Sequence, residues 1–115
     1  MLKLNLSYTK PQVSINGIVF DVLKSDAAIV QDMLDLDSKF AKEDMSNPAN
    51  VLKKNERMLA YLDELLGKDA RKKILGTLEG CSDLGLGGVD RLLSEIVQAA
   101  GRAYSTAFAL KYEDD

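Results

Sequence analysis

The 115-residue sequence contains no histidine, no tryptophan and a single cysteine, Cys81. The absence of histidine excludes His-based acid–base catalysis, Ser–His and Cys–His triads, and His-ligated metal sites. One cysteine excludes an intrachain disulfide and a thiolate metal cage, and it fits a reducing compartment or indifference to redox state. We therefore predict a protein that is not an enzyme and that uses no cofactor and no metal.

Long apolar runs and an excess of positive charge are also missing. No run approaches the about 18 apolar residues that indicate a transmembrane helix, and the N-terminus alternates apolar with polar residues, unlike a signal peptide. Fifteen basic against 18 acidic side chains give a net charge of −3, which argues against a general nucleic-acid binder. We expect a cytoplasmic protein with no membrane partner.

The first 24 residues are predicted to form a β-hairpin region. Residues 2–7 alternate apolar with polar side chains, the period of a strand with one apolar face. Residues 13–15 and 18–20 flank Asn16-Gly17, a strong hairpin signal because both residues tolerate the positive φ angles of a type I′ turn. The two-residue turn sets the register of the hairpin, and residues 2–7 are expected to join it as a third strand.

From Ser25 onward the spacing of apolar residues becomes helical. Ser25 is placed to cap a first helix, which is expected to end before Ser46. Asn47 and Pro48 suit the cap and first position of a second helix, which Gly67 stops.

Two further helices are predicted, a short one over residues 68–75 and a long one from Val89 to Tyr112. A glycine-rich connector over residues 76–88 separates them. The length predicts one domain, residues 1–115, with a β-hairpin region over 1–24 and a helical region over 25–115. The predicted fold class is α+β, mainly α: a small N-terminal antiparallel β-hairpin or sheet followed by about four helices.

Two patterns superficially resemble functional sites. Residues 85–88 read Gly-Leu-Gly-Gly before a helix, but Val89 and Asp90 stand where a phosphate-binding Walker loop needs lysine and a hydroxyl residue. Acidic residues gather over 35–44, but Lys39 and Phe40 occupy positions that a calcium loop reserves for a ligand and a glycine. We interpret the first as a flexible connector and the second as a solvated helix face.

Cys81 and one basic region complete the search for chemistry. No histidine or adjacent cation activates the Cys81 thiol, so we interpret it as structural. The basic region lacks the aromatic side chains that stack on bases, and it is either a solvated face or a surface for an acidic partner or nucleic acid. Its residues are Lys53, Lys54, Arg57, Arg71, Lys72 and Lys73.

The last helix carries apolar or small side chains around more than half of its circumference. One neighbouring helix cannot cover so wide a surface. The helix is therefore either a core element packed on several sides or a surface that binds a helix of another protein or a second copy of this chain. For the second case, the predicted contact residues are Val97, Ala100, Tyr104, Ala107 and Phe108.

The order of elements resembles the tail assembly chaperones of long-tailed phages and prophages. Residues 13–45 carry the resemblance: a hairpin with an I-N-G-x-x-[FY] pattern, here Ile15-Asn16-Gly17-Ile18-Val19-Phe20, and then a helix that opens after Ser25. The remaining helices match that family in length and amphipathicity only.

The resemblance implies a non-enzymatic role. Such chaperones bind the tape measure protein, a very long helical chain with exposed apolar stripes, and keep it soluble in the host cytoplasm until the tail tube assembles. The alternatives are a head–tail or tail component that stays in the virion, and a small regulatory module that binds nucleic acid through the basic region.

Overall fold

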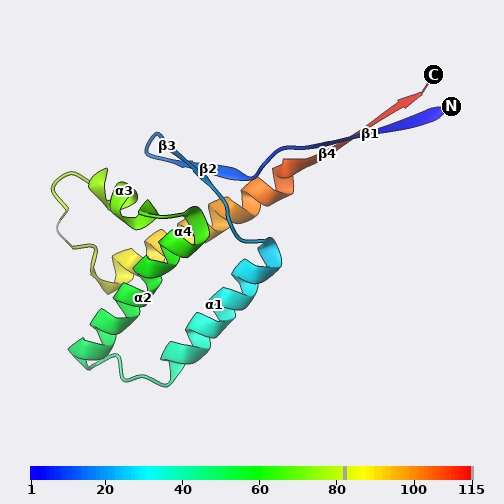
Figure 1. The fold of residues 1–115 in the computed structure, drawn as a ribbon. Coiled ribbons are helices and arrows are strands. Elements are labelled where there is room, and N and C mark those ends of the chain that lie inside the picture. The colour runs from blue at the N-terminus through cyan, green and yellow to red at the C-terminus, as the bar shows by residue number, and fades with distance from the viewer. Residues whose placement is uncertain (82, 115) are drawn as a thin grey trace.

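The computed structural model describes residues 1–81 and 83–114, and Figure 1 shows the arrangement of its elements. Helices make up 58% and strands 19%, so the predicted class, α+β and mainly α, is confirmed. In chain order the elements are β1 (Leu2–Tyr8), β2 (Gln12–Ile15), β3 (Ile18–Asp21), α1 (Asp26–Ala41), α2 (Pro48–Leu66), α3 (Ala70–Gly76), α4 (Gly85–Ala107) and β4 (Phe108–Asp114).

The hairpin β2–β3 forms as the sequence predicts. Asn16 and Gly17 have φ angles of +49° and +86°, the positive values that a type I′ turn requires. The antiparallel register pairs Ile15 with Ile18. The inward side chains of the hairpin belong to the same core cluster as the helices, and β2 packs against α4.

Residues 2–7 do not join this hairpin, and here the predicted three-stranded sheet is wrong. β1 instead pairs with β4, antiparallel from Leu2 opposite Asp114 to Tyr8 opposite Phe108. The predicted extension of the last helix to Tyr112 is also wrong, since α4 ends at Ala107. The physical reason is that residues 108–112 alternate apolar with polar or small side chains, which matches the alternation of β1 across a two-stranded ladder.

We call the β1–β4 pair the terminal ribbon. Figure 1 shows it running away from the helices, with both chain termini at its far end. It gives the molecule extents of 66 × 33 × 20 Å and a radius of gyration of 17.8 Å, against roughly 13 Å for a compact domain of this length. The apolar side chains of the ribbon share one face, which we call the ribbon face: Leu2, Leu4, Leu6, Tyr8, Phe108, Leu110 and Tyr112.

The predicted helix starts are confirmed for α1 and α2. Ser25 Oγ accepts a hydrogen bond from the Ala28 amide (3.2 Å), and Asn47 Oδ1 accepts one from the Ala49 amide (3.0 Å). Gly67 ends α2 at a φ of +108°, where a side chain would be strained. These caps satisfy amides that helix ends leave without an intrahelical partner.

The second half of the chain differs from prediction at its helix boundaries. α3 begins at Ala70, two residues later than predicted, after Asp69 adopts a left-handed φ of +64°. α4 begins at Gly85, so residues 85–88 form its first turn instead of the end of a connector. Residue 82, within the predicted connector, lies outside the described residues.

The core lies where α2, α3, α4 and the hairpin meet. Its largest fully buried side chains are Tyr61, Leu62 and Leu65 of α2 and Ile74 of α3. α4 contributes one stripe of buried residues at helical spacing: Val89, Leu93, Ile96, Ala100 and Ala107.

A polar network joins α1 to this core. Tyr61 donates a hydrogen bond to Asp32 Oδ2 (2.7 Å), and the Lys24 ammonium binds the same oxygen (2.7 Å). The hydrogen bonds from Lys24 and then Tyr61 lower the pKa of Asp32, while burial, followed by the bond to Asp32, raises the pKa of Tyr61. The network therefore holds the Asp32 carboxylate in its charged form.

This network predicts acid sensitivity. Because the pKa of Asp32 is lower in the folded state, its contribution to stability is present above the unfolded pKa of about 3.9 and is lost as the pH falls through the folded value. We expect Asp32→Asn to reduce the free energy of unfolding by about 1 kcal/mol at pH 7, with the difference from wild type shrinking toward pH 3. Urea unfolding of both proteins between pH 7 and pH 3 measures this difference in the free energy of unfolding. Tyr61→Phe should keep part of the pH dependence, and parallel curves for Asp32→Asn and wild type would contradict the prediction.

Candidate functional site

The predicted contact residues on α4 separate into core and surface. Ala100 and Ala107 are 0% and 4% exposed, so the structure corrects their assignment as partner-binding residues. Val97 and Tyr104 are half-buried, and the Tyr104 hydroxyl donates to the Lys24 carbonyl oxygen at 2.5 Å. Phe108 is 54% exposed and belongs to β4.

The correction has a simple cause in the packing of α4. This helix contacts α1, α2, β2 and β4, so different sectors of its apolar circumference meet different neighbours. The predicted alternative, a core helix packed on several sides, describes α4. The large apolar side chains that the described residues leave exposed lie outside α4.

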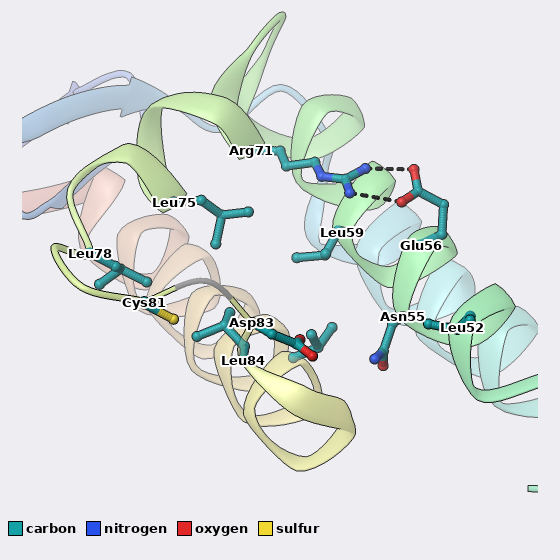
Figure 2. A pocket seen from close by; sticks show the side chains of 11 residues that line it. Leu52, Asn55, Glu56, Leu59, Arg71, Leu75, Leu78, Cys81, Asp83 and Leu84 are labelled. Carbon is teal, nitrogen blue, oxygen red and sulfur yellow. Dashed lines mark hydrogen bonds and ion pairs between the residues drawn. The ribbon is translucent and has the colours of Figure 1, made fainter. Parts of the chain in front are cut away.

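A cleft opens between α2, α3, the following loop and the start of α4, and Figure 2 shows its lining. Its volume of about 310 Å³ is at the lower end of small-ligand pockets, which span about 300–1,000 Å³. Most of the lining is aliphatic, so we call it the leucine cleft. Its residues are Leu52, Asn55, Glu56, Leu59, Arg71, Leu75, Leu78, Cys81, Asp83, Leu84 and Val89.

The lining of the leucine cleft includes two polar features that could orient a ligand. The Arg71 guanidinium binds the Glu56 carboxylate through two bonds of 2.6 and 2.7 Å, which join α3 to α2 (Figure 2). This pairing lowers the pKa of Glu56 and raises that of Arg71, so both stay charged. Asn55 Oδ1 is buried, and within the described part of the chain it accepts no hydrogen bond. A buried acceptor without a donor is costly, so a ligand that supplies an N–H or O–H would gain affinity there.

The hairpin turn helps to position one wall of the leucine cleft. The Asn16 side-chain amide donates to Thr77 Oγ1 (2.9 Å), and Thr77 Oγ1 donates to the Ile74 carbonyl (2.6 Å). These bonds connect the β2–β3 turn to the C-terminal end of α3. Leu75 and Leu78, on either side of Thr77, line the cleft.

The glycine-rich start of α4 does not form a phosphate loop. Asp83 Oδ1 accepts a hydrogen bond from the Gly85 amide at 2.9 Å. A carboxylate thus already occupies part of the space in which a phosphate would meet the first turn, and it would repel one. Residues 85–88 therefore form neither a phosphate loop nor the predicted flexible connector, since they make up the first turn of α4.

Part of the acidic cluster and both arginines of the basic region make local contacts. Asp44 Oδ1 accepts bonds from the amide and hydroxyl of Ser46, at 2.9 and 2.6 Å. Among the described residues, no group of three or more acidic or cysteine side chains is arranged to hold a metal ion. In the basic region Arg57 pairs with Glu64 (3.1 Å), as Arg71 does with Glu56. Both arginines of the basic region are therefore paired with carboxylates.

A second, smaller cavity of about 240 Å³ lies among α1, α2 and α4. Val97 is the one predicted contact residue that lines it. Its lining combines methionine, aliphatic and aromatic side chains with charged side chains of both signs. The lining residues are Met33, Leu36, Asp37, Phe40, Lys54, Met58, Asp90, Leu93, Ser94, Val97 and Gln98.

Sequence reasoning missed the leucine cleft because α2 builds one part of it, and α3 with the loop and first turn of α4 builds the other. The available signal was Leu52 and Leu59, which lie on α2 two turns apart and beside the stripe that includes Met58 and Leu62. The sequence shows that the apolar face of α2 is wider than a single neighbouring helix would cover, but it does not show which segment packs against the remainder.

In the part of the chain that the structure describes, none of the helices is both long and apolar enough to cross a membrane. Comparison of the chain with family models, curated proteins and solved structures finds no match.

Proposed function

We propose that this chain is a non-enzymatic tail assembly chaperone of a long-tailed phage or prophage. In this proposal it binds the tape measure protein in the bacterial cytoplasm and keeps it soluble until the tail tube assembles. The observation that carries the proposal is the leucine cleft, a recess with leucine side chains in its lining that the described residues leave open. The resemblance of residues 13–45 to that family supplies the identity of the client.

The size and chemistry of the leucine cleft suit one anchor side chain of a helix. A volume of about 310 Å³ accepts a large aliphatic or aromatic side chain but not an extended cofactor. Leu52, 69% exposed at the edge of the cleft, offers apolar surface to the neighbouring turn of such a helix. Amphipathic helices that dock in this way present anchors at spacings of three, four and seven residues.

Reversible binding follows from the same features. A client with unpaired apolar stripes aggregates unless those stripes are covered. A shallow site that buries one or two anchors per contact binds each stripe weakly and releases it when tube subunits offer a larger apolar surface. The hydrogen bond from Asn16 to Thr77 links the hairpin signature to the cleft wall, so the element that carries the resemblance also shapes the site.

Leu52→Glu tests the proposal. Because Leu52 is exposed, the substitution should leave the fold intact while placing a charge at the cleft edge. We expect affinity for the tape measure protein of the same genome to fall at least about tenfold, as for an interface anchor, and the soluble fraction of the co-expressed client to fall with it. Pull-down and sedimentation of lysates measure both.

Leu34→Glu is the matched control, since Leu34 is 56% exposed on α1 and lines neither cavity. It should bind and solubilise the client like wild type. Equal binding by Leu52→Glu and wild type, or equal loss in both variants, would count against the leucine cleft as the client site.

One observation favours the second candidate, a tail component retained in the virion. Both outer edges of the terminal ribbon are open to strand addition in the described structure, a mode by which assembled subunits join. Mass spectrometry of purified particles separates the two functions. A structural component is present in them at a fixed ratio to tube subunits, whereas an assembly chaperone is absent.

A further inference from the structure

The ribbon face is an apolar surface that nothing in the described chain covers. Its side chains are between 50% and 67% exposed, although all are leucine, tyrosine or phenylalanine. Cross-strand pairs such as Leu6 with Leu110 and Leu4 with Tyr112 bring them together on one side. The opposite side carries Asn5, Ser7 and Lys111, so the ribbon is strongly amphipathic.

A two-stranded ribbon that exposes one apolar face to water is not expected to be stable on its own. In water an isolated strand pair is marginally stable, and it needs further strands or a packed surface to persist. Figure 1 shows the ribbon extending beyond the helices, so α4 meets only its base. Packing against another molecule would supply the apolar contacts that the described chain does not make to the ribbon face.

We propose that the ribbon face is the interface of a homodimer, in which two ribbons pack face to face. Seven large apolar side chains, each at least half exposed, together present on the order of several hundred Å², since one fully exposed aromatic side chain alone offers about 150–250 Å². A standard stable interface takes about 800 Å² from each partner. The exposed apolar area on one ribbon is therefore of the order that a dimer interface takes from each partner.

A second copy fits this surface better than an unrelated chain. A two-fold interface is made of the same patch on both molecules, and the ribbon face is apolar along its length except for Asp114 at the tip, opposite Leu2. Two such faces leave no buried charge unpaired along their centre, and the closed pair covers an apolar patch that would otherwise favour aggregation. This inference does not rest on the proposed function, which uses the leucine cleft.

Sedimentation equilibrium of the whole chain under reducing conditions tests the dimer. We expect a mass of twice 12.6 kDa at micromolar concentration. Leu6→Glu should weaken dimerisation at least about 100-fold, as expected at the centre of an interface. Leu6→Thr, which keeps a β-forming side chain but removes apolar surface, should also weaken it. Ser7→Glu adds the same charge to the polar side of the ribbon and should leave the dimer intact.

Three results would overturn the dimer proposal. One is a wild-type chain that stays monomeric up to sub-millimolar concentration. Another is a dimer that persists unchanged in Leu6→Glu, which would place the interface elsewhere. The third is equal weakening by Ser7→Glu and Leu6→Glu, because the effect would then not depend on the ribbon face.

Discussion

Leu65→Ala is expected to reduce the free energy of unfolding by about 4 kcal/mol, within the range of about 2–5 kcal/mol for buried leucines. Leu65 is 0% exposed in the core cluster that α2, α3, α4 and the hairpin share. Truncation removes its transfer free energy and leaves a cavity that rigid helix backbones fill only in part. The whole domain is held by roughly 5–15 kcal/mol, so this one change removes a large fraction of its stability.

Thermal and urea unfolding measure this effect. The midpoint temperature should fall by roughly 15–25 °C for a domain of this size. The Leu65 carbonyl, which accepts a bond from the Leu23 amide at 2.8 Å, is unaffected by the substitution, so the loss reports on side-chain packing. Leu34→Ala on the exposed side of α1 is the control and should change stability by less than about 0.5 kcal/mol. A loss below about 1 kcal/mol in Leu65→Ala would contradict the assigned core.

Ala100→Asp should abolish folding. Ala100 is 0% exposed on the buried stripe of α4, and an aspartate there would place a carboxylate among apolar side chains with no cation near it in the core cluster. An unpaired buried charge costs several kcal/mol, and the larger side chain also overpacks the site. Together these costs approach the total stability. Circular dichroism and amide NMR spectra should show an unfolded chain.

Phe108→Asp is the comparison for Ala100→Asp. It introduces the same charge eight residues later, at a position 54% exposed on β4, and should leave the helical core folded. The two variants also distinguish the sequence-based prediction from the structure. The sequence predicts that both residues contact a partner, whereas the structure buries Ala100 and exposes Phe108. If Ala100→Asp folded normally and lost only client binding, Ala100 would be a contact residue after all.

Local signals predicted most of the fold. The Asn16-Gly17 turn, the Ser25 and Asn47 caps and the Gly67 stop each act through neighbouring backbone groups, and each appears where the sequence places it. The terminal ribbon was missed because its pairing joins opposite ends of the chain. The helical stripe of α4 also continues in phase through Phe108, so helix and strand periods compete at that residue.

The candidate site was less accessible to sequence reasoning. The α4 residues looked like a partner surface because the width of an apolar stripe does not say how many neighbours cover it. Ala100 and Ala107 are covered, whereas Leu52 and the ribbon face are among the apolar surfaces that stay exposed. Only the packing of α2 against α3 and α4 creates the leucine cleft, and no spacing within one segment encodes it.

The pairing of Tyr8 with Phe108 encloses nearly the whole polypeptide in one loop. Closing so long a loop lowers the entropy of the chain, and this loss opposes pairing until the contacts between the two ends have formed. We therefore expect the helices and the hairpin to form before the two ends of the chain pair. They are also the first segments to separate in a native-state fluctuation, since few core contacts hold them. Such opening leaves the leucine cleft in place, so the client binding and the dimerisation that we propose should respond independently to temperature and concentration.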